Sequence, residues 1–199
     1  GVYATVGPSQ LGTSIVATGT HSIYIDNGST PGLTNNNCLR KVLPSARNKV
    51  GACGRFYFAT LPSGNVGGTI FDFLSDIPER SNLACIVDAN GCIRFIRDRN
   101  YYTIDGENGT LVAISDPIIV AGAWNHIEVQ VYIHPSAGWV RVAVNGVHRF
   151  QATSLNTQGW SGNIYSISQS TGIGGSGGAS PFYMDDLIYY DFNGNSAVD

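Results

Sequence analysis

The chain has 199 residues, a length that suits one domain able to bury roughly 70% of its unfolded surface. Charged residues make up only 13% of the sequence, Lys occurs twice, and the formal net charge is −3, which argues against nucleic acid as a partner. No apolar run approaches the ~20 residues of a membrane-spanning helix, so no membrane partner is expected.

Short runs of alternating apolar and polar residues recur along the chain, separated by Gly, Asn, Pro and Ser. This pattern is typical of an all-β sandwich or barrel, and we find no clear helical periodicity. The predicted strands cover residues 21–26, 38–43, 54–61, 69–75, 83–88, 92–98, 111–115, 125–134, 139–145, 163–168 and 182–191.

The two ends of the chain differ in how clearly they indicate structure. Residues 1–34 are interpreted as an N-terminal arm or edge strand, and residues 35–199 as a single β-domain. The Gly-rich stretch 171–178 resembles a linker, but only about twenty residues follow it, too few to fold alone. We therefore expect it to be a loop within the same domain.

Residues 123–146 predict a hairpin with one apolar and one polar face. An upstream turn at residues 88–91 ends in Asn-Gly, which favours a second tight hairpin. Because a one-residue slip would mix the two faces of the first hairpin, its register should be well defined. The expected pairs are Ile133 with Val140, Tyr132 with Arg141, and Glu128 with Asn145.

The four cysteines, Cys38, Cys53, Cys85 and Cys92, fit no zinc motif, because the sequence has no CxxC and no paired His. A tight hairpin at residues 88–91 would not place Cys85 directly opposite Cys92. We expect buried free thiols, with a single disulfide as the alternative.

A succession of motifs runs along the chain: LRKVLPS at 39–45, GRFYF at 54–58, IFDF at 70–73, WNHIEV at 124–129, VRVAVNG at 140–146 and YMDDL at 183–187. Their order and spacing resemble the laminin-G-like, concanavalin A-like jelly rolls, most closely those among structural proteins of tailed-bacteriophage virions. The resemblance covers roughly residues 34 to 192. It implies a two-sheet antiparallel jelly-roll sandwich, although the fold alone does not decide function.

The expected core of this sandwich follows from the apolar parity of the strands. It comprises Phe56, Phe58, Ile70, Phe71 or Phe73, Ile127, Val129, Val131, Val140, Val142, Val144 and Ile188.

Hydrolysis on this fold would require a pair of carboxylates. Retaining glycosidases hold two carboxyl groups about 5 Å apart, which alternate positions on one strand provide. The corresponding stretch here, residues 128–132, contributes only Glu128, and the adjacent Asp185 and Asp186 would point to opposite faces of a strand. One of these aspartates is expected to accept hydrogen bonds from a neighbouring loop. The sequence therefore predicts a protein that is not an enzyme.

Carbohydrate binding remains open, because aromatic rings beside polar groups are typical of sugar sites. The candidate residues are Trp139, Tyr132, Glu128, Arg141 and Trp160. Three further residues, Asp105, Glu107 and Asn108, could supply oxygen ligands to calcium, but we favour ordinary turn residues there, and no other cofactor is indicated.

The resemblance favours a non-catalytic protein on the surface of a virion, as a capsid decoration or a tail or fibre component. Such a protein would serve assembly, particle stabilisation or attachment to the host surface. Its partners would be other virion proteins and, in some settings, host-surface glycans, and a homo-oligomer is plausible. The alternative function is a glycan-binding, lectin-like module, either calcium-dependent or not.

Overall fold

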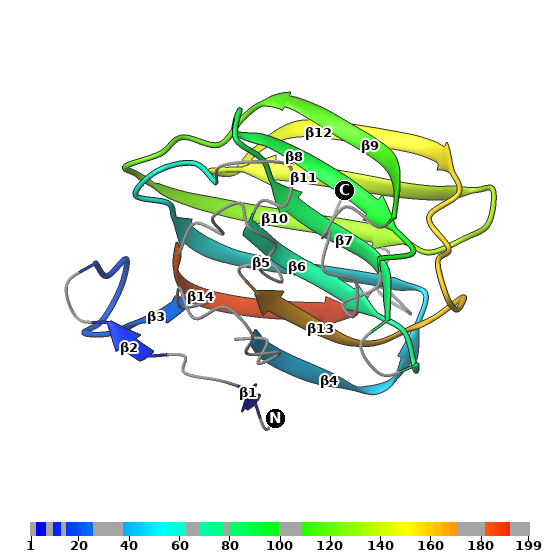
Figure 1. Cartoon of the computed structure of the whole chain (residues 1–199), viewed down its shortest axis with the longest axis horizontal. Helices are drawn as coiled ribbons and strands as arrows, with labels where there is room; N and C mark the ends of the chain where they lie inside the picture. Colours follow the sequence, from blue (N-terminus) through cyan, green and yellow to red (C-terminus); the bar gives the residue numbers. More distant parts are fainter. Residues whose placement is uncertain are drawn as a thin grey trace.

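The computed structural model describes residues 3–6, 10–12, 15–25, 38–62, 68–77, 80–99, 109–170 and 182–191. These residues form fourteen strands in two seven-stranded antiparallel sheets that lie face to face (Figure 1). The two-sheet antiparallel jelly-roll sandwich predicted from the sequence is therefore confirmed. Among the described residues, no helix has the length and hydropathy needed to cross a membrane.

Each sheet combines strands that are far apart in the sequence. Sheet A, nearer the viewer in Figure 1, has the strand order β1 (Tyr3–Val6), β4 (Cys38–Arg47), β13 (Ile164–Ser170), β6 (Gly68–Leu74), β7 (Ser81–Val87), β8 (Cys92–Arg97) and β9 (Thr110–Pro117). Sheet B, behind it, has the order β12 (Val147–Leu155), β11 (Gly138–Val144), β10 (Trp124–Tyr132), β5 (Lys49–Tyr57), β14 (Phe182–Asp191), β3 (Ser22–Ile25) and β2 (Gln10–Gly12).

The core lies between the sheets and is filled by the inward-facing apolar residues of both. The predicted core residues are buried, with one exception, Ile188, whose side chain is 57% exposed. The prediction for Ile188 was wrong because β14 contains a bulge between Asp185 and Ile188, where Asp186 adopts a φ of +52°. The bulge reverses the parity of the strand, so Leu187 and Tyr189 pack against the core instead.

The hairpin of β10 and β11 has the predicted faces but a different register. Val131 pairs with Val140, Tyr132 with Trp139, and Gln130 with Arg141, so the expected pairs were displaced by two residues. A shift of two residues preserves which side chains face the core. The turn is tightened by Nδ1 of His134, which accepts hydrogen bonds from the backbone N–H groups of Ser136 (3.1 Å) and Ala137 (2.8 Å).

Strand β12 was missed by the sequence analysis. It pairs with β11 through a turn in which Asn145 and Gly146 both have positive φ, as a type I′ hairpin requires. Most β12 side chains are exposed, and its pairing with β11 contains two irregularities. An exposed, bulged edge strand has no regular apolar alternation, which explains the miss.

Two local predictions are confirmed. The turn at residues 88–91 closes the hairpin of β7 and β8, with Asp88 accepting the N–H groups of Asn90 and Cys92. Cys53, Cys85 and Cys92 are buried free thiols, and burial raises the pKa of each. The side chain of Cys38 lies outside the described residues.

Candidate functional site

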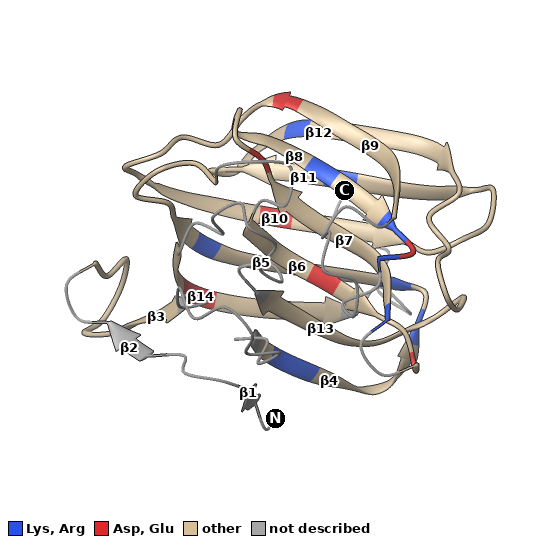
Figure 2. Ribbon diagram, in the orientation of Figure 1, with Lys and Arg blue, Asp and Glu red and all other residues tan. Residues whose placement is uncertain are grey.

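The outer face of sheet B carries the polar row of the β10–β11 hairpin. On β10 the inward residues Ile127, Val129 and Val131 are fully buried, so Glu128, Gln130 and Tyr132 point away from the core. Charged residues are sparse on both sheets (Figure 2). Each charged side chain on this face therefore contributes a large share of the local electrostatic potential.

Glu128 is the polar centre of this face. One of its carboxylate oxygens, Oε1, accepts hydrogen bonds from the hydroxyl of Tyr190 (2.7 Å) and from Nε2 of Gln130 (3.0 Å). Burial raises the pKa of Tyr190 far above its ordinary value, and the hydrogen bond to Glu128 and the charge of that carboxylate raise it further. Tyr190 therefore stays protonated and donates a hydrogen bond to Glu128, and it is a poor proton donor to a ligand.

Next to this centre lies a group of two rings and two cations, Lys49, Tyr132, Trp139 and Arg141, here called the aromatic–cation cluster. The rings of Tyr132 and Trp139 are 6.2 Å apart between centroids. Lys49 Nζ lies 4.7 Å from the centre of the Tyr132 ring, and the Arg141 guanidinium lies 5.0 Å from that of Trp139. Nε of Arg141 is buried and has no hydrogen-bond partner among the described residues.

The structure brings most of the sequence candidates together but not all. Glu128, Tyr132, Trp139 and Arg141 share the outer face of sheet B. Trp160 lies elsewhere, in the segment between β12 and β13, where the guanidinium of Arg80 sits 4.2 Å from its ring centre.

The proposed calcium ligands cannot be placed in the site. Asp105, Glu107 and Asn108 lie outside the described residues. Within the described ranges, no group of three or more His, Cys, Asp or Glu side chains is arranged to hold a metal ion.

Three residues of the site were not candidates from the sequence: Lys49, Gln130 and Tyr190. Lys49 begins β5, whose first five residues preceded the predicted strand. Tyr190 lies on a strand that was predicted, but the bulge at Asp186 conceals which face it occupies. Gln130 could have been found, because it alternates with Glu128 and Tyr132 on the same strand.

Asp185 and Asp186 have a structural role. Oδ2 of Asp185 accepts the backbone N–H groups of Ala17 (3.3 Å) and Thr18 (3.0 Å), and Oδ1 of Asp186 accepts the hydroxyl of Thr18 (2.8 Å). Asp186 also forms an ion pair with Arg55 at 3.3 Å. The expectation that one of these aspartates binds a neighbouring loop is confirmed.

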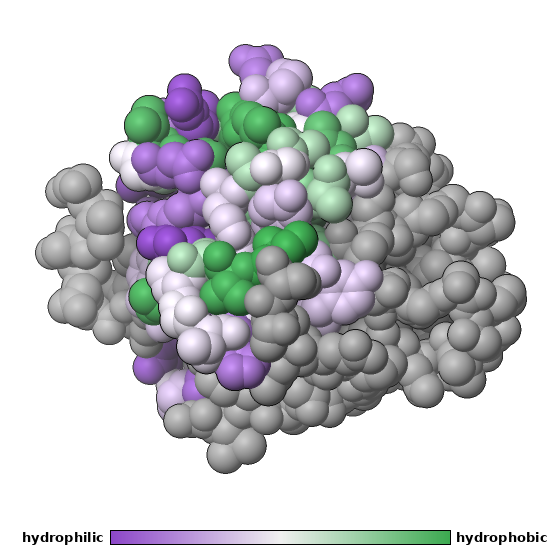
Figure 3. All heavy atoms as spheres, turned by 90° about the vertical axis from the view of Figure 1, so that its left-hand side faces the viewer, coloured by the Kyte–Doolittle hydropathy of each residue, from purple (hydrophilic) through white to green (hydrophobic). Residues whose placement is uncertain are grey.

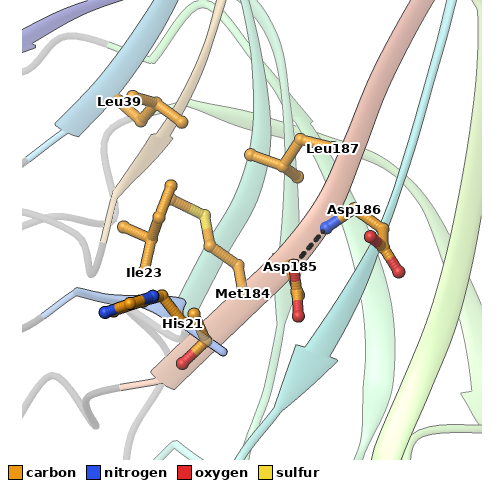
Figure 4. Close-up of a pocket in the computed structure, with 8 residues that line it drawn as sticks. His21, Ile23, Leu39, Met184, Asp185, Asp186 and Leu187 are labelled. Carbon is orange, nitrogen blue, oxygen red and sulfur yellow. Dashed lines mark hydrogen bonds between the residues drawn. The ribbon is translucent and has the colours of Figure 1, made fainter. Parts of the chain in front are cut away.

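A cavity of about 310 Å³ lies beside these aspartates (Figure 4). Its walls are largely apolar and include Ile23, Leu39, Met184 and Leu187, while His21 and the two aspartates line its polar side. Because both carboxylates already accept hydrogen bonds from the loop at residues 17–18, the polar side of this cavity is occupied by the protein's own contacts.

Comparison with known proteins gives the fold but no family. No family model matches the sequence, and no curated protein matches it. Among solved structures, an endo-β-1,4-glucuronan lyase from the fungus Trichoderma reesei matches 96% of this chain and 90% of its own, with a TM-score of 0.66 and 12% identity. The carbohydrate-binding module CBM66 from Bacillus subtilis matches 94% of each chain, with a TM-score of 0.53 and 8% identity.

The receptor-binding domain of botulinum neurotoxin D is a third similar structure, with a TM-score of 0.58 and 8% identity. The match covers 96% of this chain but only 44% of the toxin structure. At identities this low, all three comparisons establish the fold and nothing finer.

One prediction from the sequence is corrected by these comparisons. The conclusion that the chain is not an enzyme was wrong, because it considered only hydrolysis and the carboxylate pair that hydrolysis needs. The glucuronan lyase shows that this fold also carries polysaccharide cleavage of another kind. Among the described residues of β10, Glu128 has no second carboxylate beside it to form the pair that a glycosidase needs, and this does not exclude catalysis of another kind.

Proposed function

We propose that the outer face of sheet B binds an anionic glycan at the aromatic–cation cluster. The observation that carries this proposal is the pairing of each ring with a cation, Lys49 with Tyr132 and Arg141 with Trp139. Aromatic rings give a sugar a flat apolar surface to stack on, and cations beside them select a carboxylate on that sugar.

The energetics favour a charged ligand over a neutral one. A cation resting on an exposed ring contributes only about 0.5–1 kcal/mol. A charge-assisted hydrogen bond to a carboxylate is stronger, roughly twice a neutral one. A bound carboxylate would therefore draw Lys49 and Arg141 away from the rings and leave the ring faces to the sugar. The unpaired Nε of Arg141 would gain a partner in the same step.

The similar structures support this proposal in a general way, since one is a carbohydrate-binding module and one a toxin receptor-binding domain. The alternative function inferred from the sequence, a glycan-binding module, is thus better supported than a purely structural role. The location on a virion rests on the sequence resemblance alone. We propose it as the setting in which glycan binding would serve host attachment, and the copy number of the chain in purified particles, measured by quantitative mass spectrometry, tests it.

Calorimetric titration with a matched pair of ligands tests the binding proposal. Glucuronan and cellulose oligosaccharides of equal length share a β-1,4 backbone and differ in the carboxyl group. The wild-type protein should bind the glucuronan oligosaccharide more tightly, and Trp139→Ala should weaken that binding roughly tenfold. Trp160→Ala is the matched control, because its ring lies away from this face. Failure of either glycan to bind, or equal losses in both variants, would contradict the proposal.

A second candidate function is cleavage of the bound glycan by β-elimination. The observation that favours it is the placement of His134 and Tyr132, whose rings lie 5.3 Å apart, beside the cations of the aromatic–cation cluster. In β-elimination a base removes the proton on the carbon beside the uronate carboxyl, a cation neutralises that carboxyl, and an acid protonates the departing glycosidic oxygen. No second carboxylate is needed.

This reaction leaves a carbon–carbon double bond in the product, and hydrolysis does not. Incubation of the protein with polymeric glucuronan, followed by ultraviolet absorbance and mass spectrometry of the products, therefore separates the two. Unsaturated products that disappear with Tyr132→Phe would support a lyase. Binding without any product would leave a non-catalytic glycan-binding module.

A further inference from the structure

A second group of aromatic side chains crosses the outer face of sheet B. Trp124, Tyr57, Tyr183 and Tyr24 come from four adjacent strands, and each is the register partner of the next. Their ring centroids are separated by 5.7 Å, 6.3 Å and 4.8 Å in that order. We call these four residues the aromatic row.

The aromatic row belongs to the outer face and not to the core. The residues next to these rings in sequence, among them Phe56, Met184 and Asn125, are buried, so the rings point the other way. All four rings remain partly exposed. The aromatic row is therefore a surface feature, separate from the apolar core between the sheets.

The end of the sandwich near the aromatic row is shown facing the viewer in Figure 3. Its apolar residues form small groups between pale and hydrophilic ones, so the described part of this end has no broad apolar patch. Aromatic rings set among polar groups are typical of a carbohydrate site.

The row and the aromatic–cation cluster lie at opposite ends of the same strand. Trp124 is the first residue of β10 and Tyr132 is the last, eight residues away. At a rise of about 3.3 Å per residue, this separation is about 26 Å. A disaccharide cannot reach both groups of rings, but a longer glycan chain can.

The surface between the two ends is polar. His126, Glu128 and Gln130 follow one another along β10. The ring of Tyr190, on β14, lies directly over Gly51 of the neighbouring strand β5. A Cβ atom at Gly51 would collide with this ring. Tyr190 is therefore held close to the sheet and does not divide the face into two.

We propose that the aromatic row is a second sugar subsite and that the ligand is a polymer chain lying along β10 from the cluster to the row. This inference rests on the proposed glycan binding and specifies the length and orientation of the ligand. The two ends recognise different features. At the row, Arg55 is already paired with Asp186, so this end binds sugar faces through stacking and does not select for a carboxylate.

The test compares chain lengths. Calorimetric titrations would use a glucuronan disaccharide and a glucuronan octasaccharide with the wild-type protein, Tyr57→Ala and Tyr57→Phe. Tyr57 contacts both Trp124 and Tyr183, so Tyr57→Ala interrupts the row, while Tyr57→Phe keeps the ring. Tyr57→Ala should weaken octasaccharide binding roughly tenfold and leave disaccharide binding within twofold, and Tyr57→Phe should change neither.

The outcomes separate this inference from the proposed function. If Trp139→Ala abolishes binding of both lengths but Tyr57→Ala affects neither, glycan binding stands and the second subsite is wrong. If Tyr57→Ala weakens both lengths equally, the extended chain is wrong as well. If no glycan of any length binds, the proposed function and this inference both fail.

A second measurement does not depend on the stability of Tyr57→Ala. The chain has three tryptophans, and one lies in the row, one in the cluster and one away from both. The double variant Trp139→Phe/Trp160→Phe leaves Trp124 as the only tryptophan and keeps an aromatic ring in the cluster. Saturating octasaccharide should shift the emission of Trp124, and saturating disaccharide should not. An unchanged Trp124 emission with the octasaccharide would overturn the proposal.

Discussion

The ring of Tyr190 lies against the backbone of Gly51, so closely that a Cβ atom at Gly51 would collide with its ring. The two residues are register partners on β14 and β5. This close approach lets the Tyr190 hydroxyl reach across β5 to Oε1 of Glu128 on β10, at 2.7 Å. Gly51 is therefore needed for its missing side chain, and the polar centre of the outer face depends on it.

Replacing Gly51 with alanine should push the Tyr190 ring off the sheet and break its hydrogen bond to Glu128. We expect a loss of about 1–3 kcal/mol in the free energy of unfolding, measured by urea denaturation. Gly162→Ala is the control, because its added Cβ would meet no atom closer than 3.9 Å and should change stability by less than ~0.5 kcal/mol. In a Tyr190→Ala background the cost of Gly51→Ala should largely disappear, and equal costs in both backgrounds would contradict the steric explanation.

Replacing Glu128 with glutamine should strengthen the binding of an anionic glycan. The carboxylate is the one acidic group described near the aromatic–cation cluster, and it repels a ligand carboxylate, whereas a glutamine oxygen can still accept from Tyr190. We expect a two- to fivefold gain in affinity for a glucuronan octasaccharide at low salt, which shrinks as salt is added. The cellulose octasaccharide is the matched control and should bind equally to both proteins. A loss for both ligands would instead mean that Glu128 contacts sugar hydroxyl groups.

The β10–β11 hairpin shows what the sequence could predict about this site. Strict alternation of apolar residues at Ile127, Val129 and Val131 determines which side chains leave the core, so Glu128 and Tyr132 were correctly assigned to the outer face. The register was not determined in the same way, because a shift of two residues keeps every side chain on its face. The turn of this hairpin contains a contact that the alternation does not predict, because the ring of His134 accepts hydrogen bonds from two backbone N–H groups.

The rest of the site depends on contacts that alternation within one strand does not encode. Lys49 reaches Tyr132 from β5, which is adjacent to β10 in the sheet, and Tyr190 reaches Glu128 from β14, one strand further away. Both strands are far from β10 in the sequence. The strand order of a jelly roll must be known before such pairs can be proposed. The bulge at Asp186 adds a second difficulty, because it exchanges the faces of Leu187 and Ile188 without any interruption in the apolar pattern.

The two hydrogen bonds to Asp185 should stabilise the loop at residues 17–18. Asp185→Ala would leave the N–H groups of Ala17 and Thr18 without their acceptor, and we expect a loss of roughly 1–3 kcal/mol in unfolding free energy. Asp76→Ala, at an exposed position, is the control and should be nearly neutral. Hydrogen exchange at Thr18 offers an independent readout, since its amide should exchange faster in Asp185→Ala. Unchanged exchange in that variant would show that the loop does not depend on this carboxylate.

Asp72, on β6, should make the stability of the protein depend on pH. Its side chain is fully buried, and Ser81 and Arg99 are among the nearby groups that favour its charged form. Burial raises the pKa of Asp72 from 3.8 to about 6, although the nearby guanidinium of Arg99 opposes this shift. Arg99 is itself buried and donates a hydrogen bond from Nη1 to the hydroxyl of Thr69 at 2.7 Å.

The direction of the pH effect follows from proton binding. Between pH 3.8 and about 6, the folded chain keeps the proton of Asp72, whereas the unfolded chain has already lost it. The stabilising contribution of this group is therefore complete at pH values below 3.8 and is lost as the pH rises through about 6. The full change is on the order of 3 kcal/mol.

Asp72→Asn isolates this contribution, because the other titrating groups are the same in both proteins. Urea denaturation at pH 4, 5, 6 and 7 would give the difference in unfolding free energy between the variant and the wild type. That difference should move in favour of Asp72→Asn as the pH rises from 4 to 7, by up to roughly 3 kcal/mol, whatever its sign at pH 4. A difference that stays constant over this range would mean that Asp72 has an ordinary pKa in the folded protein, and that Arg99 compensates fully for its burial.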